Sequence, residues 1–304
     1  MVSLVTGGAG FIGSSLVEDL EDVVVVDDLS TANEYSIRFV EESGAEFIKG
    51  SITDLKLMKQ VLDGVETVYH QAAIPSVPRS IKDPLRTNQA NIGGTLNLLV
   101  ACWDAGVRNL VYASSSSVYG DTPALPKVEN MPPNPKSPYA ITKLMGEHYM
   151  RVFNELYGLR TVSLRYFNVF GPRQNPDSEY SAVIPKFVKA ALAGQPITIY
   201  GDGLQTRDFT YVTDVVEANK KAAGKVGIYN IAGGKQITIR ELADKIVELT
   251  GSRSEIEYVD ERKGDVKHSL ADITKAGKKL AWQPKYTLEQ GLKEYIDCYS
   301  KLTP

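Results

Sequence analysis

Residues 2–13 read Val-Ser-Leu-Val-Thr-Gly-Gly-Ala-Gly-Phe-Ile-Gly, and this stretch decides the fold. The first five residues are mostly apolar or β-branched and predict a short buried strand. Gly7 allows a tight turn, Gly10 lets the backbone approach a pyrophosphate, and Gly13 lets a helix pack closely on the strand. The N-terminus of that helix offers free N–H groups to an anion. The stretch therefore predicts a strand, a glycine turn and a helix that together bind the phosphates of a dinucleotide.

A second apolar run, residues 23–26, ends in two carboxylates. Asp27 stands 20 residues after Gly7, and Asp28 follows it. A dinucleotide-binding fold places the acid that holds the adenosine ribose at about this distance. A carboxylate there would repel a 2′-phosphate, and no arginine follows directly to neutralise it. The sequence therefore favours NAD over NADP.

Apolar strand-like runs alternate with helical patterns through the first half of the chain, as in βαβ units. Strands are expected at residues 4–6, 23–27, 46–49, 67–71, 110–114 and 162–167. This order predicts an α/β protein with a doubly wound parallel sheet of the Rossmann type. Ligands of such sheets bind beyond the carboxyl ends of the strands.

The length of the chain and the distribution of its proline and glycine residues predict two structural units. At 304 residues the chain exceeds the usual size of a single core. After Asn168, proline and glycine separate short apolar runs. We expect an NAD-binding domain over residues 1–168 and a smaller C-terminal α/β lobe for the substrate over residues 169–304. A strand near residues 228–231 is expected to return to the first sheet.

The composition of the chain argues against nucleic-acid binding, membrane association and metal binding. The chain has 34 Lys and Arg against 37 Asp and Glu, a net charge of −3, and these charges are dispersed. Dispersed charge gives no case for nucleic acid or an anionic membrane surface. We find no signal peptide and no apolar run near the ~18 residues that a membrane span requires, so the cytoplasm is the expected compartment. Two cysteines and three scattered histidines give no metal-ligand spacing, and no metal is expected.

A serine run and a later Tyr-x-x-x-Lys pair are typical of a catalytic set. The chain reads Ser-Ser-Ser-Ser-Val-Tyr-Gly over residues 114–120, and Tyr139 and Lys143 follow. Residues four apart lie on one face of a helix, so the ammonium of Lys143 can favour the ionised form of Tyr139. A free phenol titrates near ~10, and the lysine and a cationic nicotinamide ring are expected to lower that pKa. By itself, this spacing equally fits a packed aromatic ring beside a solvated lysine.

Together these residues resemble the extended short-chain dehydrogenase/reductase family, and within it the nucleotide-sugar 4-epimerases. The resemblance covers nearly the whole chain. It rests on the glycine stretch, Gln71-Ala-Ala73, Asn91, the serine run, Tyr139 and Lys143, Arg165-Tyr-Phe-Asn168, Gly201-Asp-Gly203, residues 207–214 and Arg262-Lys-Gly-Asp265.

The resemblance implies roles for individual residues. The catalytic set would be Ser115, Tyr139 and Lys143. The cofactor would contact Gly7, Gly10, Phe11, Ile12, Gly13, Asp27, Asp28, Ile52, Ala72, Ala73, Asn91, Tyr139, Lys143 and Tyr166. The nucleotide sugar would contact Ser116, Asn168, Tyr200, Arg207, Arg262, Asp265 and Ser269. Arginine forks suit the diphosphate oxygens of such a substrate.

The implied reaction is an NAD-dependent 4-epimerisation. Tyr139, bridged by Ser115, would take the proton of the sugar 4′-hydroxyl while hydride leaves C4′. The keto sugar would turn over and take the hydride back on its other face. UDP-glucose and UDP-galactose are the expected substrates, and the small Ser269 leaves room for the N-acetyl group of UDP-GlcNAc or UDP-GalNAc.

Three alternatives remain open. A UDP-glucuronate 4-epimerase is less favoured, because such enzymes tend to carry threonine where this chain has Asn168. An NAD(P)-dependent nucleotide-sugar reductase would use the same catalytic set. A non-catalytic nucleotide-sensing scaffold is disfavoured by the presence of both Tyr139 and Lys143.

Two further features bear on the cofactor and on assembly. Ser51 stands where relatives usually have an aspartate for the adenine amine, and Pro75 where many have lysine, which puts the affinity for NAD in doubt. The helical patterns at 88–105 and 139–157 carry apolar residues on more than one face. In the family these helices form a four-helix bundle, so a homodimer is expected.

Overall fold

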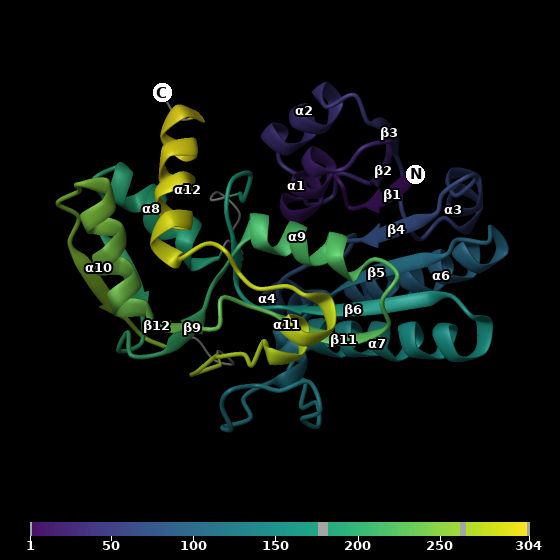
Figure 1. Ribbon diagram of the computed structural model, residues 1–304. Helices are drawn as coiled ribbons and strands as arrows, with labels where there is room; N and C mark the ends of the chain where they lie inside the picture. Colours follow the sequence, from purple (N-terminus) through teal and green to yellow (C-terminus); the bar gives the residue numbers. More distant parts are fainter. Residues whose placement is uncertain (1, 176–181, 262–265, 303–304) are drawn as a thin grey trace.

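The computed structural model describes residues 2–175, 182–261 and 266–302, and Figure 1 shows how they are arranged. Within these residues a seven-stranded sheet runs in the order β11-β6-β5-β4-β1-β2-β3, and all its neighbouring strands are parallel. In chain order its strands are β1 (Ser3–Thr6), β2 (Val23–Asp27), β3 (Glu46–Lys49), β4 (Thr67–His70), β5 (Asn109–Ser115), β6 (Arg160–Tyr166) and β11 (Gly227–Ile231). The expected doubly wound Rossmann sheet is confirmed, and each predicted strand matches an observed one to within two residues at either end.

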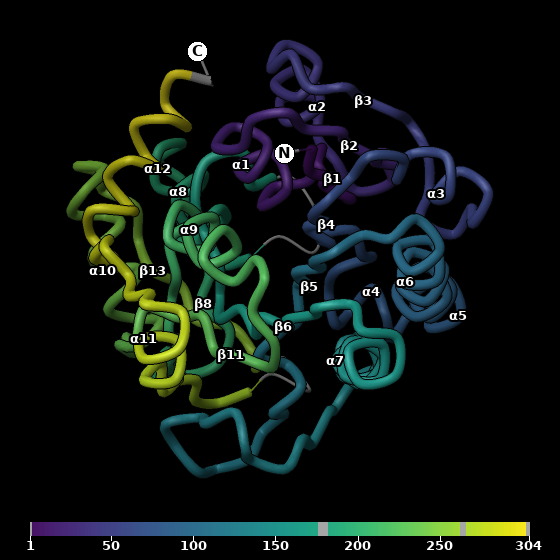
Figure 2. The backbone as a smooth tube through the Cα atoms, turned by 45° about the vertical axis from the view of Figure 1, so that its right-hand side comes forward, coloured from purple at the N-terminus to yellow at the C-terminus, as the bar shows by residue number. Residues whose placement is uncertain are grey.

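Helices cover both faces of this sheet (Figure 2). One face carries α1 (Phe11–Asp19), α2 (Glu34–Glu42), α9 (Val212–Ala222) and α11 (Thr274–Leu280), whose apolar side chains share a core with β1, β2 and β6. The other face carries α3 (Leu55–Val61), α6 (Gly94–Asp104) and α7 (Pro138–Tyr157). Short helices α4 (Val77–Lys82) and α5 (Pro84–Asn88) pack on α7. Two apolar layers therefore bury the sheet, as a parallel sheet requires.

The helix expected at 88–105 is present, but a π-helical turn interrupts its regular α-helical hydrogen bonding. α5 ends at Asn88, residues Gln89–Gly93 form a π-helical turn, and α6 starts at Gly94. A π turn inserts one extra residue, which rotates the side chains that follow it, and such turns are frequent at functional sites. Apolar periodicity continues through the turn, so the sequence pattern alone could not show it.

A second core lies beside the sheet, at the left of Figure 1. It packs α8 (Val183–Leu192), α10 (Ile239–Thr250) and α12 (Leu288–Leu302) around three small two-stranded sheets. These sheets pair β7 (Val169–Phe170) with β10 (Thr210–Tyr211), β9 (Thr206–Asp208) with β12 (Gln236–Thr238), and β8 (Ile197–Tyr200) with β13 (Ile256–Val259).

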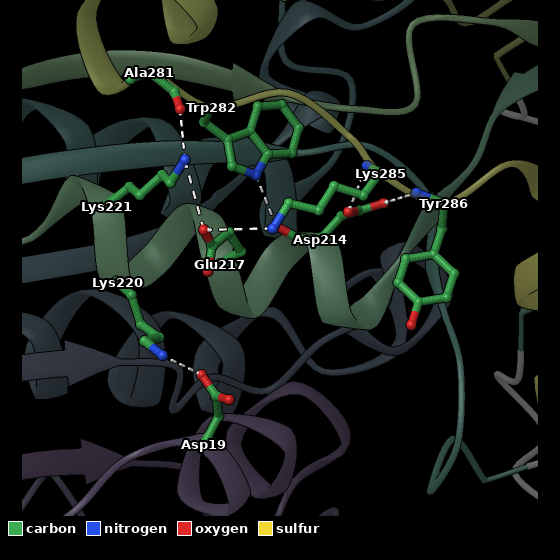
Figure 3. A network of polar contacts seen from close by, with 9 residues as sticks. All are labelled: Asp19, Asp214, Glu217, Lys220, Lys221, Ala281, Trp282, Lys285 and Tyr286. Carbon is green, nitrogen blue, oxygen red and sulfur yellow. Dashed lines mark hydrogen bonds and ion pairs between the residues drawn. The ribbon is translucent and has the colours of Figure 1, made fainter.

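The chain after residue 169 contributes to both cores. α9, β11 and α11 pack with the first core, whereas α8, α10 and α12 form the second. Asp214 on α9 fixes the segment that joins α11 to α12 (Figure 3). Its carboxylate accepts from Lys285 N at 2.8 Å and Tyr286 N at 3.2 Å, and its carbonyl accepts from Trp282 Nε1 at 2.9 Å. Lys220 on α9 also pairs with Asp19 of α1 at 2.5 Å.

None of the helices in the described ranges combines the length and the apolar character that a membrane crossing would need.

A buried ion pair ties α7 to β5 and β6. Arg165 Nη2 lies 2.7 Å from Glu147 Oε2, its Nε lies 2.8 Å from Oε1, and both side chains are 2% exposed. Ser114 Oγ donates to the same carboxylate at 2.5 Å. Since α7 carries Tyr139 and β5 ends at Ser115, the pair fixes the distance between two elements of the expected catalytic set.

We predict that Arg165→Met destabilises the protein by about 3 kcal/mol, because it leaves the buried Glu147 carboxylate without its charge partner. The double variant Glu147→Met/Arg165→Met should recover part of this loss, since it removes both charges. Urea unfolding of the three proteins measures the difference. A double variant no more stable than Arg165→Met would contradict this account.

Candidate active site

A cavity of about 630 Å³ opens at the carboxyl ends of the strands, where β1 and β4 lie side by side. The chain leaves these two strands in opposite directions across the sheet, and such a switch point is where open α/β sheets bind ligands. Most residues expected to contact a cofactor line it: Gly7, Gly10, Phe11, Ile12, Gly13, Asp27, Asp28, Ile52, Ala72, Ala73, Tyr139, Lys143 and Tyr166.

The glycine turn leaves no room for side chains. Gly7 has φ +71°, and a Cβ on it would lie 2.6 Å from Ala72 N. A Cβ on Gly13 would lie 2.0 Å from Gly7 O, inside the first turn of α1. α1 has no side-chain cap at Gly10, so its first N–H groups remain available to an anion. These residues fit the pyrophosphate of a dinucleotide.

Asp27 stands beside this turn. Its carboxylate accepts from Ala9 N at 3.0 Å and from Leu29 N at 2.8 Å. Burial raises the pKa of Asp27, while these two hydrogen bonds act in the opposite direction. The carboxylate is thereby held at the edge of the cavity, where its remaining lone pairs can accept ribose hydroxyls.

Ser115, Tyr139 and Lys143 come together from β5 and α7. The Ser115 hydroxyl is close enough to the Tyr139 phenol to act on its pKa. Lys143 Nζ lies 5.9 Å from the centre of the Tyr139 ring and donates to Ala113 O at 2.7 Å. Ser137 caps α7 by accepting from Ala140 N at 3.1 Å, which sets the start of the helix that carries Tyr139 and Lys143.

The pKa shifts differ from the expected ones. Burial raises the pKa of Tyr139 to about 12, an effect that Ser115 partly offsets. Burial lowers the pKa of Lys143 to about 7. Burial therefore outweighs the effect of Ser115 on the phenol, and the expected lowering depends on the additional positive charge of a bound nicotinamide ring.

Tyr166 and Asn91 are held in place by neighbouring polar groups. Tyr166 Oη donates to Asn219 Oδ1 at 3.0 Å, and burial raises its pKa. Asn91 is 2% exposed, accepts from Ile74 N at 2.8 Å and donates to Thr142 Oγ1 at 3.1 Å. Asn91 thus holds the loop after β4 through Ile74. Although it was expected to contact the cofactor, it does not line the cavity.

A second cavity of about 280 Å³ lies over β8 and α8 and is lined by Tyr200, Arg207 and Phe187, among others. Asn168 is held near β9, because its Nδ2 donates to Asp208 O at 2.9 Å. Ser269 N donates to Thr206 O at 3.2 Å, next to Arg207. Ser116 begins a 3₁₀ turn (Ser116–Tyr119) directly after Ser115. Arg262 and Asp265 lie outside the described residues.

Several residues that line the first cavity were not expected. They include Asn33, Arg79, Arg173, Gln174 and Asn175. Arg173 reaches α1 across more than 150 positions in the chain, so no local pattern could indicate this contact. Ser51 and Pro75, the two departures noted in the sequence, also line the cavity.

Comparison with known proteins agrees with this geometry. A sequence model of the NAD dependent epimerase/dehydratase family matches residues 3–232, which is most of the chain. The chain belongs to this family. The extended short-chain dehydrogenase/reductase resemblance is therefore confirmed, and the protein is an NAD-dependent enzyme of the epimerase type.

Individual relatives cover the whole enzyme. It is 40% identical over 309 residues to the UDP-glucose 4-epimerase of Mycolicibacterium smegmatis, with 98% of each chain covered. A solved UDP-N-acetylglucosamine 4-epimerase from Methanobrevibacter ruminantium superposes with a TM-score of 0.95 at 41% identity, covering 99% of each chain. A Thermus thermophilus UDP-glucose 4-epimerase in complex with NAD gives 0.91 at 38% identity, with 99% of each chain covered. A UDP-glucuronate 4-epimerase of Thermodesulfobacterium geofontis is 36% identical, with 97% of this chain and 94% of that one covered.

His70, at the end of β4, is a buried histidine whose protonation links the stability of the protein to pH. Its ring nitrogens lie 2.8 Å from Thr6 Oγ1 and 2.9 Å from Thr95 Oγ1. Burial, with a smaller effect of the Lys143 charge, lowers its pKa to about 3. The unfolded chain binds a proton near pH ~6.5 that the folded protein excludes, so the contribution of His70 is complete above that pH and is lost as the pH falls toward 3.

We predict that His70→Gln removes the acid destabilisation that His70 causes, about 2 kcal/mol between pH 8 and pH 5. Urea unfolding at pH 8, 6.5 and 5 measures it, and His148→Gln, at an exposed position of α7, is the matched control. Parallel pH profiles for the wild type and His70→Gln would contradict the prediction.

Proposed function

We propose that the enzyme is a UDP-hexose 4-epimerase that acts on UDP-glucose and UDP-galactose and also on their N-acetylated counterparts. The observation that carries this proposal is that Tyr139 and Lys143 line the dinucleotide cavity together, with Ser115 acting on the Tyr139 phenol beside them. Full-length similarity to enzymes named UDP-glucose and UDP-N-acetylglucosamine 4-epimerases supports it.

In this proposal Tyr139 takes and returns the proton of the sugar 4′-hydroxyl. NAD, when bound, supplies the reversible hydride acceptor for C4′ and a positively charged ring. Ser115 donates to or accepts from the phenol and bridges it to the sugar, while the Lys143 ammonium stabilises the phenolate. Because burial raises the pKa of Tyr139 to about 12, both positive charges are needed for a base near neutral pH.

Inversion at C4′ further requires that the sugar turn over while its diphosphate stays anchored. In this proposal, Arg207 at the second cavity and Asn168 beside β9 hold the nucleotide end. Arg207 Nη1 donates to Thr206 O at 2.9 Å, which orients its guanidinium on β9. Ser269 is hydrogen-bonded to the same strand, and its small side chain would leave space for an acetamido group beside C2′.

A UDP-glucuronate 4-epimerase is the second candidate, since one relative over nearly the full chain carries that name. It requires a group that accepts the C6 carboxylate. Asn168, in place of the threonine typical of those enzymes, disfavours it. A reductase that releases its cofactor in each cycle would use the same three catalytic residues.

Incubation with UDP-galactose, UDP-N-acetylgalactosamine and UDP-glucuronate, without added cofactor, tests the proposal. We expect NMR to show C4′ epimers of the first two. Tyr139→Phe should bind NAD but lower kcat by about 10³-fold, the order expected for loss of a general base. Conversion of UDP-glucuronate alone would favour the second candidate, and net consumption of NADH or NADPH would favour the reductase.

We also propose a homodimer built on α6 and α7. Trp103 on α6 and Leu156 and Tyr157 on α7 are 50%, 72% and 43% exposed, and the Trp103 and Tyr157 ring centroids are 5.0 Å apart. Ile141 and Met145 extend this apolar surface along α7. A surface of this kind on two adjacent helices suits packing against its own copy.

Light scattering should give twice the mass of the chain. Leu156→Glu should shift the enzyme toward the monomer, because the substitution buries a carboxylate in the interface. Val226→Glu changes another apolar residue, 47% exposed, which precedes β11 and belongs to neither α6 nor α7, and should stay dimeric. A monomeric wild type would refute the dimer.

A further inference from the structure

After β7 the chain crosses from the second core to α1. We call residues 171–175 the strap. Its central residue, Arg173, has φ +68°, a conformation that is uncommon for a residue other than glycine. Its side chain is only 7% exposed. A non-glycine residue keeps such a backbone only where the surrounding contacts enforce it.

The guanidinium of Arg173 lies on the first two turns of α1. Its Nε donates to Ser14 Oγ at 3.0 Å, and its Nη2 donates to Ser15 Oγ at 3.1 Å and to Glu18 Oε2 at 2.5 Å. The guanidinium carbon is 4.2 Å from the centre of the Phe39 ring on α2. Charged hydrogen bonds and stacking of this kind are stronger than neutral contacts, especially where water is excluded.

The backbone of the strap is bonded to the same region. Arg173 O accepts from Asn33 Nδ2 at 3.0 Å. Asn33 also caps α2 by accepting from Ser36 N at 2.9 Å, and Ser36 Oγ donates to Ala9 O in the glycine turn at 2.6 Å. A continuous network thus joins the strap, the start of α2 and the turn that holds the pyrophosphate.

The strap and this network border one cavity. Arg173, Gln174 and Asn175 line the dinucleotide cavity together with Gly10, Gly13 and Asn33. The Gln174 Oε1 atom is buried, and no group in the described part of the chain hydrogen-bonds it. Nothing in the reaction chemistry of Ser115, Tyr139 and Lys143 requires these contacts, so they call for another role.

We propose that Arg173 retains NAD: its contacts with α1 and α2 hold the strap across the cavity and slow the release of the dinucleotide. Release then requires that the strap separate from α1, which breaks all the Arg173 contacts together. Slow release of NAD suits an enzyme whose cofactor returns to its starting oxidation state at the end of each cycle. The inference rests on the proposed epimerisation for this functional advantage and for nothing else.

Arg173→Met tests the proposal, since it keeps the apolar stem against Phe39 and removes every charged hydrogen bond. We expect at least a tenfold faster release of NAD, followed as bound NAD is displaced by excess etheno-NAD and its fluorescence changes. The NAD content after gel filtration should fall in parallel. Both readouts need no sugar, so they remain valid if the epimerase proposal fails.

Lys220→Met is the matched control. It breaks another ion pair to α1, with Asp19 at 2.5 Å, the residue next to Glu18 (Figure 3). Neither Lys220 nor Asp19 lines the dinucleotide cavity. Lys220→Met should release NAD at the wild-type rate. If it releases NAD as fast as Arg173→Met does, a general loosening of α1 explains the effect and the proposal is overturned.

A second variant covers the case in which Arg173→Met folds poorly. Glu18→Gln removes one charge from the exposed side of the contact, where Glu18 is 55% exposed, and should raise the release rate about two- to threefold. If Glu18→Gln and a folded Arg173→Met both release NAD at the wild-type rate, the proposal is overturned. Faster release in both, with Lys220→Met unchanged, supports it.

Discussion

The close approach between the glycine turn and the loop after β4 is the constraint on which the rest of this structure depends. A Cβ at Gly7 would lie 2.6 Å from Ala72 N, so the two backbones meet where the order of the strands reverses. This contact brings the N-terminus of α1, the carboxylate of Asp27 and the wall formed by Ala72 and Ala73 around one cavity. Ser114 at the end of β5 reaches the same cavity because β5 lies next to β4 in the sheet, and Tyr139 and Lys143 reach it from α7.

Burial and charge oppose each other at the centre of the site. The protein encloses Tyr139 and Lys143, and enclosure alone disfavours the charged form of each group. Ser114 and Ser115 are adjacent in the chain but differ in role, because Ser114 serves the buried Glu147–Arg165 pair and Ser115 serves the phenol. In the proposed reaction, Tyr139 therefore acts as a base only with the further positive charge of a bound cofactor, which couples the proposed chemistry to the presence of NAD.

Local sequence predicted what local geometry determines. The glycine turn, the Asp27 carboxylate and the Tyr139/Lys143 pair each arise from short-range spacing, and the structure places all of them at one cavity. Contacts over long distances in the chain escaped prediction. Nothing near Arg173 indicates that it reaches α1, and the amide of Asn91 is occupied by Ile74 and Thr142 for reasons that only the packed loop shows. The raised pKa of Tyr139 likewise depends on how deeply the assembled protein encloses the ring.

The late return of the chain to its first sheet has a consequence for synthesis. β11 forms the edge strand beside β6, and α11 and the fully buried Trp282 complete the core that Leu16 and Val17 of α1 begin. A chain leaving the ribosome cannot close that core until residue 282 has emerged, although its glycine turn was made first. The nascent N-terminal half must wait with an open sheet edge and an incomplete apolar face. The two cores are consequently interleaved along the chain, and neither can be exchanged between proteins as one contiguous segment.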